Sequence, residues 1–242
     1  MPTKIKTQMD APARGWLLLP LPGLCLLLLS ACTTTQKAPL TQEGVACGFL
    51  GGICTKLTPG GKDQAALRYI NPTVRWTQYN KIMIDPVTFW GGESARVSGP
   101  DQQLLVNFFH QQLREELGKK FEIVDNPGPG VMKLDVAMLD AEAATPGLRS
   151  VSMIIPQAHM LSNLKYLATG TFPFVGGAEG AAKLTDSQTG RMLSAVVDRQ
   201  IGGGSIEAGF QWQWGDAENA ITNWSKRLAE KLSSWTTGTA SP

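Results

Sequence analysis

Histidine is scarce in this chain of 242 residues, which contains only His110 and His159. Neither has an Asp, Glu or Cys at metal-ligand spacing, and no His-Glu-x-x-His motif occurs. The Gly-x-Ser-x-Gly pattern typical of many hydrolases is missing too. These absences favour structural or surface histidines, and they predict a protein without metal, cofactor or catalytic residues.

An excess of charge of one sign is also missing. The formal net charge of +2 comes from residues 1–31, which hold three basic residues and one acidic residue, so the rest of the chain has a formal charge of zero. This balance argues against a nucleic-acid partner, which would require a basic surface.

The N-terminus has the three zones of a secretory signal peptide. Basic residues come first, an apolar stretch follows over 16–29, and small residues precede Cys32. The alternative is a membrane-spanning helix, which needs about 20 consecutive apolar residues. The stretch here is shorter and is interrupted by Pro20 and Pro22.

The residues Leu29-Ser30-Ala31-Cys32 resemble the lipobox of bacterial lipoproteins. The resemblance implies that residues 1–31 are removed and that Cys32 carries a thioether lipid and an acylated amine, with palmitate-type chains. Because each buried methylene contributes about 0.8 kcal/mol, two or three such chains anchor a protein permanently. Thr33, rather than Asp, follows the cysteine, which implies the inner leaflet of the outer membrane, facing the periplasm.

Two further cysteines, Cys47 and Cys54, remain once Cys25 is removed and Cys32 is lipidated. A periplasmic address permits a disulfide, and the glycines between the two cysteines let the chain fold back. A disulfide that closes a loop this short would stabilise the folded state by about 2 kcal/mol. We favour the disulfide. Two free thiols, or a metal site with additional ligands, are the alternatives.

The remaining pattern predicts a single α/β domain, a small two-layer sandwich whose mixed sheet is packed by amphipathic helices. Residues 32–46 are small and polar and predict a flexible lipidated tether. The domain spans 47–236, and 237–242 is expected to be a disordered tail. The expected elements are strands at 81–89, 121–125 and 131–140, a helix from the N-cap Ser98 to about Leu117 with Gly118 as its cap, a hairpin of 178–184 and 192–200 around Asp186–Gly190, and a helix over 216–235.

The segment from Leu148 to Tyr166 carries more apolar surface than one short helix needs. Pro156 should divide it, with a helix over 156–167. Met160 and Leu164 on that helix either contact a partner subunit or the membrane surface, or lie in the core.

Trp212 and Trp214 would point to one side of an extended segment. Such a pair could stack on a sugar ring, although core packing is the favoured interpretation. Gly202-Gly203-Gly204 could hold a phosphate through its amides, but the surrounding pattern favours a plain loop.

Four aspartates lie on or near the ends of expected strands. Paired carboxylates can perform acid–base chemistry, but isolated, solvated side chains are the default expectation for such residues. The four are Asp85, Asp135, Asp140 and Asp198.

The chain from Phe49 to the last helix is similar to DUF3313, a bacterial lipoprotein family of unknown function. The resemblance covers nearly the whole expected domain and implies no activity. In the family, serine or another polar residue is usual where Cys47 and Cys54 lie, which implies that their bridge is not essential to the fold. The segments that carry the resemblance are Gly48-Phe49-Leu50-Gly51, Leu67-Arg68-Tyr69-Ile70-Asn71-Pro72, Ile84-Asp85-Pro86-Val87, Glu116-Leu117-Gly118, Val124-Asp125-Asn126-Pro127-Gly128-Pro129-Gly130, Ala168-Thr169-Gly170, Leu184-Thr185-Asp186-Ser187-Gln188-Thr189-Gly190 and Trp214-Gly215-Asp216-Ala217.

The sequence therefore favours a non-enzymatic, lipid-anchored envelope protein whose domain binds another envelope protein. A module for a glycan or a small ligand is the alternative, and an unrecognised hydrolase is a third. A deep pocket with convergent polar groups would favour the last two, and a shallow surface with an exposed apolar patch would favour a protein partner. The oligomeric state stays open.

Overall fold

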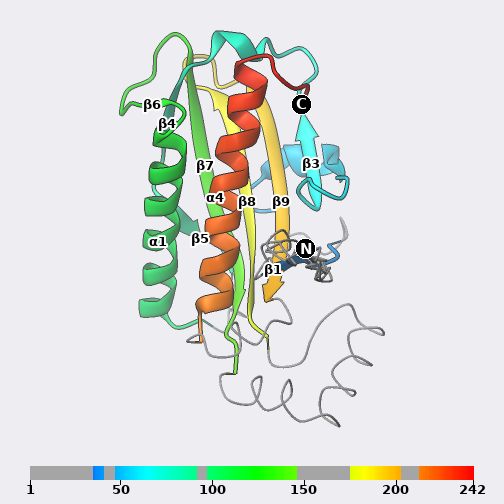
Figure 1. The fold of residues 1–242 in the computed structure, drawn as a ribbon, viewed down its shortest axis with the longest axis vertical. Helices are drawn as coiled ribbons and strands as arrows, with labels where there is room; N and C mark the ends of the chain where they lie inside the picture. The colour runs from blue at the N-terminus through cyan, green and yellow to red at the C-terminus, as the bar shows by residue number, and fades with distance from the viewer. Residues whose placement is uncertain (1–34, 41–46, 92–96, 146–174, 203–212) are drawn as a thin grey trace, which may run out of the picture. The chain divides into compact units, whose positions relative to one another are not determined.

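The computed structural model describes residues 35–40, 47–91, 97–145, 175–202 and 213–242. Over these residues, a mixed sheet of nine strands packs against two long helices (Figure 1), which confirms the predicted α/β class. Residues Thr33–Pro242 form one compact unit. Both hydrophobic cores formed by the described residues lie inside this unit, so we expect it to fold without the residues that precede it. The elements are β1 Thr35–Lys37, η2 Gly51–Lys56, β2 Thr58–Pro59, β3 Leu67–Ile70, η3 Trp76–Gln78, β4 Lys81–Ile84, β5 Thr88–Phe89, α1 Gly99–Gly118, β6 Glu122–Ile123, β7 Val131–Glu142, β8 Gly177–Asp186, β9 Met192–Gly202 and α4 Gly215–Thr236.

The sheet has the strand order β2-β3-β9-β8-β7-β4-β6, with β1 also paired to β9 and β5 to β7. The β4–β6, β4–β7 and β5–β7 pairs are parallel, and the other pairs are antiparallel. The predicted hairpin is β8–β9, and its turn chemistry is the expected one. Asp186 Oδ1 accepts from the amides of Gln188 (3.2 Å) and Thr189 (2.9 Å), and Gly190 adopts a φ of +69°.

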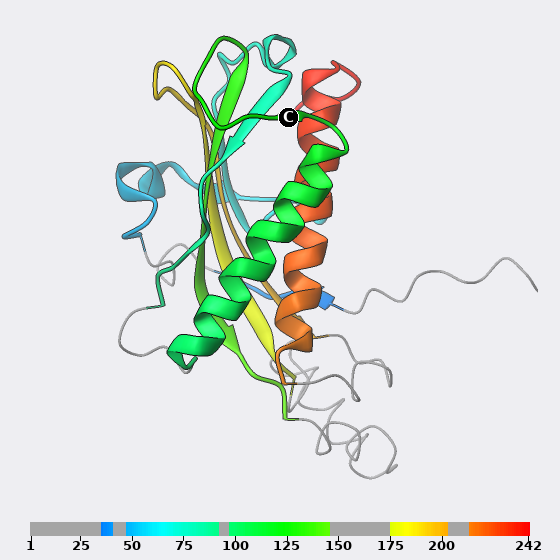
Figure 2. The same ribbon diagram turned by 90° about the vertical axis from the view of Figure 1, so that its left-hand side faces the viewer.

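Helices α1 and α4 lie side by side on one face of the sheet, as Figure 2 shows. Ser98 caps α1, since its Oγ accepts from the amide of Asp101 at 3.3 Å. The helix ends at Gly118, and Lys119 is its C-cap in a right-handed conformation, so the prediction of Gly118 as the cap is wrong. Among the described residues, no helix combines the length and apolarity that crossing a bilayer requires. The α1 residues buried at spacing four are Leu105, Phe109, Leu113 and Leu117.

The opposite face of the sheet is covered by the segment 47–57, which contains η2 (Figure 2). This face is built largely from small side chains, so the short segment can approach the strands closely. The second core contains Phe49, Leu50, Cys54 and Leu57 from the covering segment and Leu67, Ala137, Leu139, Ala181, Ala195 and Val197 from the strands.

The single strand predicted over 81–89 is wrong in one respect, because two short strands, β4 and β5, occupy this stretch. The break falls at Asp85-Pro86-Val87. Asp85 still donates its amide to Leu134 O (3.1 Å), but Pro86 has no amide hydrogen with which to continue the ladder.

The prediction of a flexible tether over 32–46 is wrong for residues 35–37, which form β1. This strand pairs with β9 from Thr35 opposite Gly202 to Lys37 opposite Gln200. The pairing satisfies backbone groups of β9 beyond the end of β3. The hydroxyl of Thr35 donates to Gln200 Oε1 at 3.0 Å and fixes the register.

The prediction of a disordered tail over 237–242 is also wrong. The last carbonyls of a helix lack partners inside the helix, and the residues after α4 supply donors to them. The amide of Gly238 donates to Trp235 O (3.2 Å) and that of Thr239 to Ser234 O (2.9 Å). The final residues, Ser241 and Pro242, line the cavity described next.

Candidate functional site

A cavity of about 160 Å³ lies between α4 and the strands β3, β9 and β8. It exists because β8 places the small residues Gly180 and Ala182 beneath α4, where Trp224 and Leu228 form the roof. A Cβ atom at position 180 would come within 3.2 Å of the Trp224 ring. The remaining apolar lining includes Ile70, Phe109, Leu113, Val136, Val196 and Trp235.

One carboxylate, Asp198 of β9, is buried in the cavity wall. Its oxygens accept from the amide of Ala66 (2.8 Å), from Trp224 Nε1 (2.8 Å) and from Gln200 Nε2 (3.2 Å). A buried carboxylate is tolerated only when hydrogen bonds replace water, and three donors do so here. The bond to Trp224 holds the indole in place over the cavity.

Three cations line the cavity: Arg68 of β3, and Arg227 and Lys231 one turn apart on α4. Lys231 is exposed and the other two are half-buried, so we refer to the three as the rim. Within the described part of the chain, none of the three forms an ion pair. The lining also contains two carboxylates, the exposed Asp63 and the buried Asp198. The charged side chains of the lining are therefore three cations and two carboxylates, an excess of one positive charge, and the cations form no ion pair with either carboxylate.

The loop that carries Asp63 is held by Lys37 of β1. Lys37 Nζ donates to the carbonyls of Gly61 (3.2 Å), Gln64 (3.0 Å) and Ala65 (3.4 Å). Gln64 and Ala65 line the cavity. A single side chain of β1 therefore fixes one wall of the cavity.

The opposite face of the sheet carries a charged group around Lys133. Its Nζ lies 2.8 Å from Asp85 Oδ2 and 3.5 Å from Asp135 Oδ1. Burial raises the pKa of Asp135; Lys133 opposes this rise and the negative charge of Asp85 adds to it. The expectation that Asp85 and Asp135 are isolated is therefore wrong, because Lys133 lies between them and pairs with both.

A second charged group lies farther along β7, β8 and β9. Burial raises the pKa of Glu179, Arg199 opposes the rise, and Asp140 adds to it. Arg199 Nη2 also donates to Glu142 Oε1 at 3.2 Å. Across the described residues, no group of three or more His, Cys, Asp or Glu side chains could hold a metal ion.

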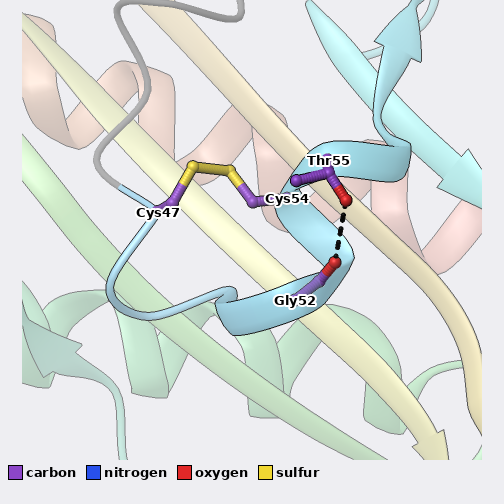
Figure 3. The surroundings of a disulfide bond; sticks show 4 residues. All are labelled: Cys47, Gly52, Cys54 and Thr55. Carbon is purple, nitrogen blue, oxygen red and sulfur yellow. Dashed lines mark hydrogen bonds between the residues drawn. A yellow bond between two sulfur atoms is a disulfide. The ribbon is translucent and has the colours of Figure 1, made fainter.

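The two remaining cysteines are joined by a disulfide at the start of the covering segment (Figure 3). The Cα atoms of Cys47 and Cys54 are 5.7 Å apart. Thr55 Oγ1 donates to Gly52 O at 3.2 Å inside the same turn. The disulfide therefore closes the segment that packs on the alanine-rich face.

The other predicted site residues are not brought together. Trp214 is 2% exposed and packs in the core at the start of α4, so it is unable to stack on a sugar ring. His110 lies half-buried on α1. Five further predictions fall on residues outside the described ranges: Cys32, His159, Met160, Leu164 and Trp212.

Sequence reasoning missed the cavity. The signal that could have revealed it is the run Gly177-Ala-Glu-Gly-Ala-Ala182, where a central strand has almost no side-chain volume. Arg68, Arg227 and Lys231 lie far apart in sequence, and the fold alone brings them to one rim.

Comparison with known proteins places these features in a family. A family model described as "Protein of unknown function (DUF3313)" matches residues 48–228. The uncharacterized lipoprotein YdcL of Escherichia coli K12 is 23% identical over 179 residues, which cover 72% of this chain and 78% of YdcL.

Solved structures with similarity to this chain include two bacterial proteins. The PelC dodecamer protein of Paraburkholderia phytofirmans has a TM-score of 0.38 and 10% identity, covering 69% of this chain and 94% of that one. The hypothetical protein CT253 of Chlamydia trachomatis has a TM-score of 0.38 and 9% identity, covering 66% and 99%.

Proposed function

Since the chain belongs to the DUF3313 family and is distantly similar to a lipoprotein, we propose that it is a lipid-anchored envelope protein whose domain is a non-enzymatic binding module for a small apolar ligand. The observation that carries the proposal is the apolar cavity under α4. An apolar cavity of about 150 Å³ accepts a benzene-sized molecule, and this one has about 160 Å³.

The residues of the cavity support binding rather than catalysis. Its lining contains no histidine or cysteine, and its buried carboxylate, Asp198, is engaged by three donors. Support for a protein-docking surface is thinner. The large hydrophobic side chains exposed among the described residues are Trp90 (48%) and Leu104 (42%).

The test of binding uses the unit 33–242 and the indole resonance of Trp224 in a two-dimensional NMR spectrum. Benzene and octanol should both shift this resonance in a saturable way. In Ala182→Leu, the added side chain fills the cavity, so the shift should disappear while the fold is kept. No saturable shift, or the same shift in Ala182→Leu, would overturn the proposal.

The anchor belongs to the same proposal: Cys32 carries the lipid, palmitate-type chains acylate it, and the protein lies on the periplasmic side of the outer membrane. The lipobox and the similarity to YdcL support the anchor, and Thr33 supports the outer membrane. Labelling cells with an alkyne fatty acid should mark the wild type and leave Cys32→Ala unlabelled. Label retained by Cys32→Ala would refute lipidation at this residue.

A further inference from the structure

The cavity and its rim differ in character, and the difference specifies the chemistry of a ligand. The interior presents aromatic and aliphatic side chains, whereas Arg68, Arg227 and Lys231 gather at the rim. Of the lining residues, Asp63, Lys231, Ser241 and Pro242 are exposed, which marks where the cavity meets solvent. A ligand that enters there buries its apolar part and leaves its polar end beside the cations.

The cations are available for a ligand. None of the three forms an ion pair among the described residues, and Asp198 is already bonded to Ala66, Gln200 and Trp224. An anionic group placed between Arg227 and Lys231 would form charge-assisted hydrogen bonds, which are about twice as strong as those between neutral groups. A neutral head group would form only the weaker type of hydrogen bond with these two side chains, in which one partner carries no charge.

Resting on the proposed function, we infer that the ligand is a single-chain anionic amphiphile, with an alkyl chain in the cavity and a carboxylate or phosphate at the Arg68–Arg227–Lys231 rim. The tether supports a membrane source for such a ligand. Lys37 binds the cavity loop, and Thr35 is three residues from Cys32. Three residues span at most about 11 Å, so a lipid on Cys32 would hold β1 close to the bilayer.

Isothermal titration of the unit 33–242 with octanoate, octyl phosphate and octanol tests the inference. At least one of the two anions should bind about tenfold more tightly than octanol, because hydrogen bonds to charged groups are the strong ones. The anion that binds more tightly identifies the head group as carboxylate or phosphate. Inorganic phosphate alone should bind far more weakly than octyl phosphate.

Substitutions of the rim cations test whether they cause the preference for an anionic head group. The double variant Arg227→Gln/Lys231→Gln should lose the preference for the anion and keep its affinity for octanol. The matched control is Lys226→Gln, which removes an exposed lysine of the same helix that does not line the cavity and should change nothing.

The inference would be overturned, while the proposed function stands, by equal affinity for octanol and both anions or by an anion preference that survives in the double variant. Inorganic phosphate binding as tightly as octyl phosphate would also overturn it, since the site would then be a simple anion site. Failure of the proposed function looks different, because octanol and benzene would then leave the Trp224 resonance unmoved.

Discussion

Both faces of the sheet include small residues of the central strands, yet one carries a cavity and the other is filled. On the helix face, the Trp224 ring of α4 packs against Gly180, and Ala182 on the same strand lines the cavity. On the opposite face, Ala137 and Ala195 are buried against the covering segment. Small side chains alone therefore do not determine whether a cavity forms.

The covering element makes the difference. A helix stands off the sheet by the length of its own side chains, and α4 is held where it is by α1, η3 and the Trp224–Asp198 hydrogen bond. The Trp224 ring already contacts Gly180, so the helix is unable to move farther down to fill the space beside Ala182. The segment 47–57 contains no long helix and follows the alanine surface closely, where Lys183 of β8 donates to the carbonyl of Phe49 at 2.9 Å and the disulfide closes the loop.

The largest expected effect comes from adding the same side chain to each face. Ala137→Leu inserts three carbons into a fully buried position and should lower the free energy of unfolding by about 3 kcal/mol, the upper part of the range for overpacked cores. Ala182→Leu should leave it unchanged or raise it, since the cavity accepts the side chain. Urea unfolding of the two variants measures both, and equal destabilisation would show that the helix face is as tightly packed as the other.

A smaller effect is expected from opening the disulfide. Cys47→Ser should cost about 2 kcal/mol, the loop entropy of so short a ring, and the domain should still fold. Cys47 is exposed, so the serine itself causes no packing defect. Dithiothreitol should destabilise the wild type by the same amount and leave Cys47→Ser unaffected. The bridge would be contradicted if dithiothreitol left the stability of the wild type unchanged and both cysteines were alkylated without prior reduction.

Much of the fold follows from local pattern. The spacing of Leu105, Phe109 and Leu113 predicts α1, and the Asp186–Gly190 turn predicts the β8–β9 hairpin, because each signal lies within a few residues. The same reasoning fails where the partner is distant. Thr35–Lys37 is polar and looks like a linker, and only the free edge of β9, more than 160 residues away, makes it a strand.

The candidate site escaped prediction for the same reason. Arg68, Arg227 and Lys231 have no common motif, and their meeting depends on how α4 crosses β3 and β9. The sequence could show that β8 is short of side-chain volume. It could not show which face α4 would cover.

The smallest expected effect concerns the carboxylates of the two faces. On the helix face, Asp198 is buried with three donors. On the other, Glu179 is 9% exposed, and the neighbouring guanidinium of Arg199 donates its hydrogen bond to Glu142 instead. Burial accordingly raises the pKa of Glu179 above its ordinary value of 4.5, against the pull of Arg199.

A raised pKa in the folded state means that protonation stabilises the fold. The contribution of Glu179 is complete below the ordinary glutamate pKa and is lost as the pH rises through the folded value. Glu179→Gln keeps the side chain neutral at every pH. It should therefore melt at a higher temperature than the wild type at pH 7, and at the same temperature near pH 4, whereas Glu230→Gln on the exposed side of α4 should differ little at either pH. A lower melting temperature for Glu179→Gln at pH 7 would mean that the attraction to Arg199 outweighs the cost of burial. In that case the ionised carboxylate would be stabilised on both faces of the sheet.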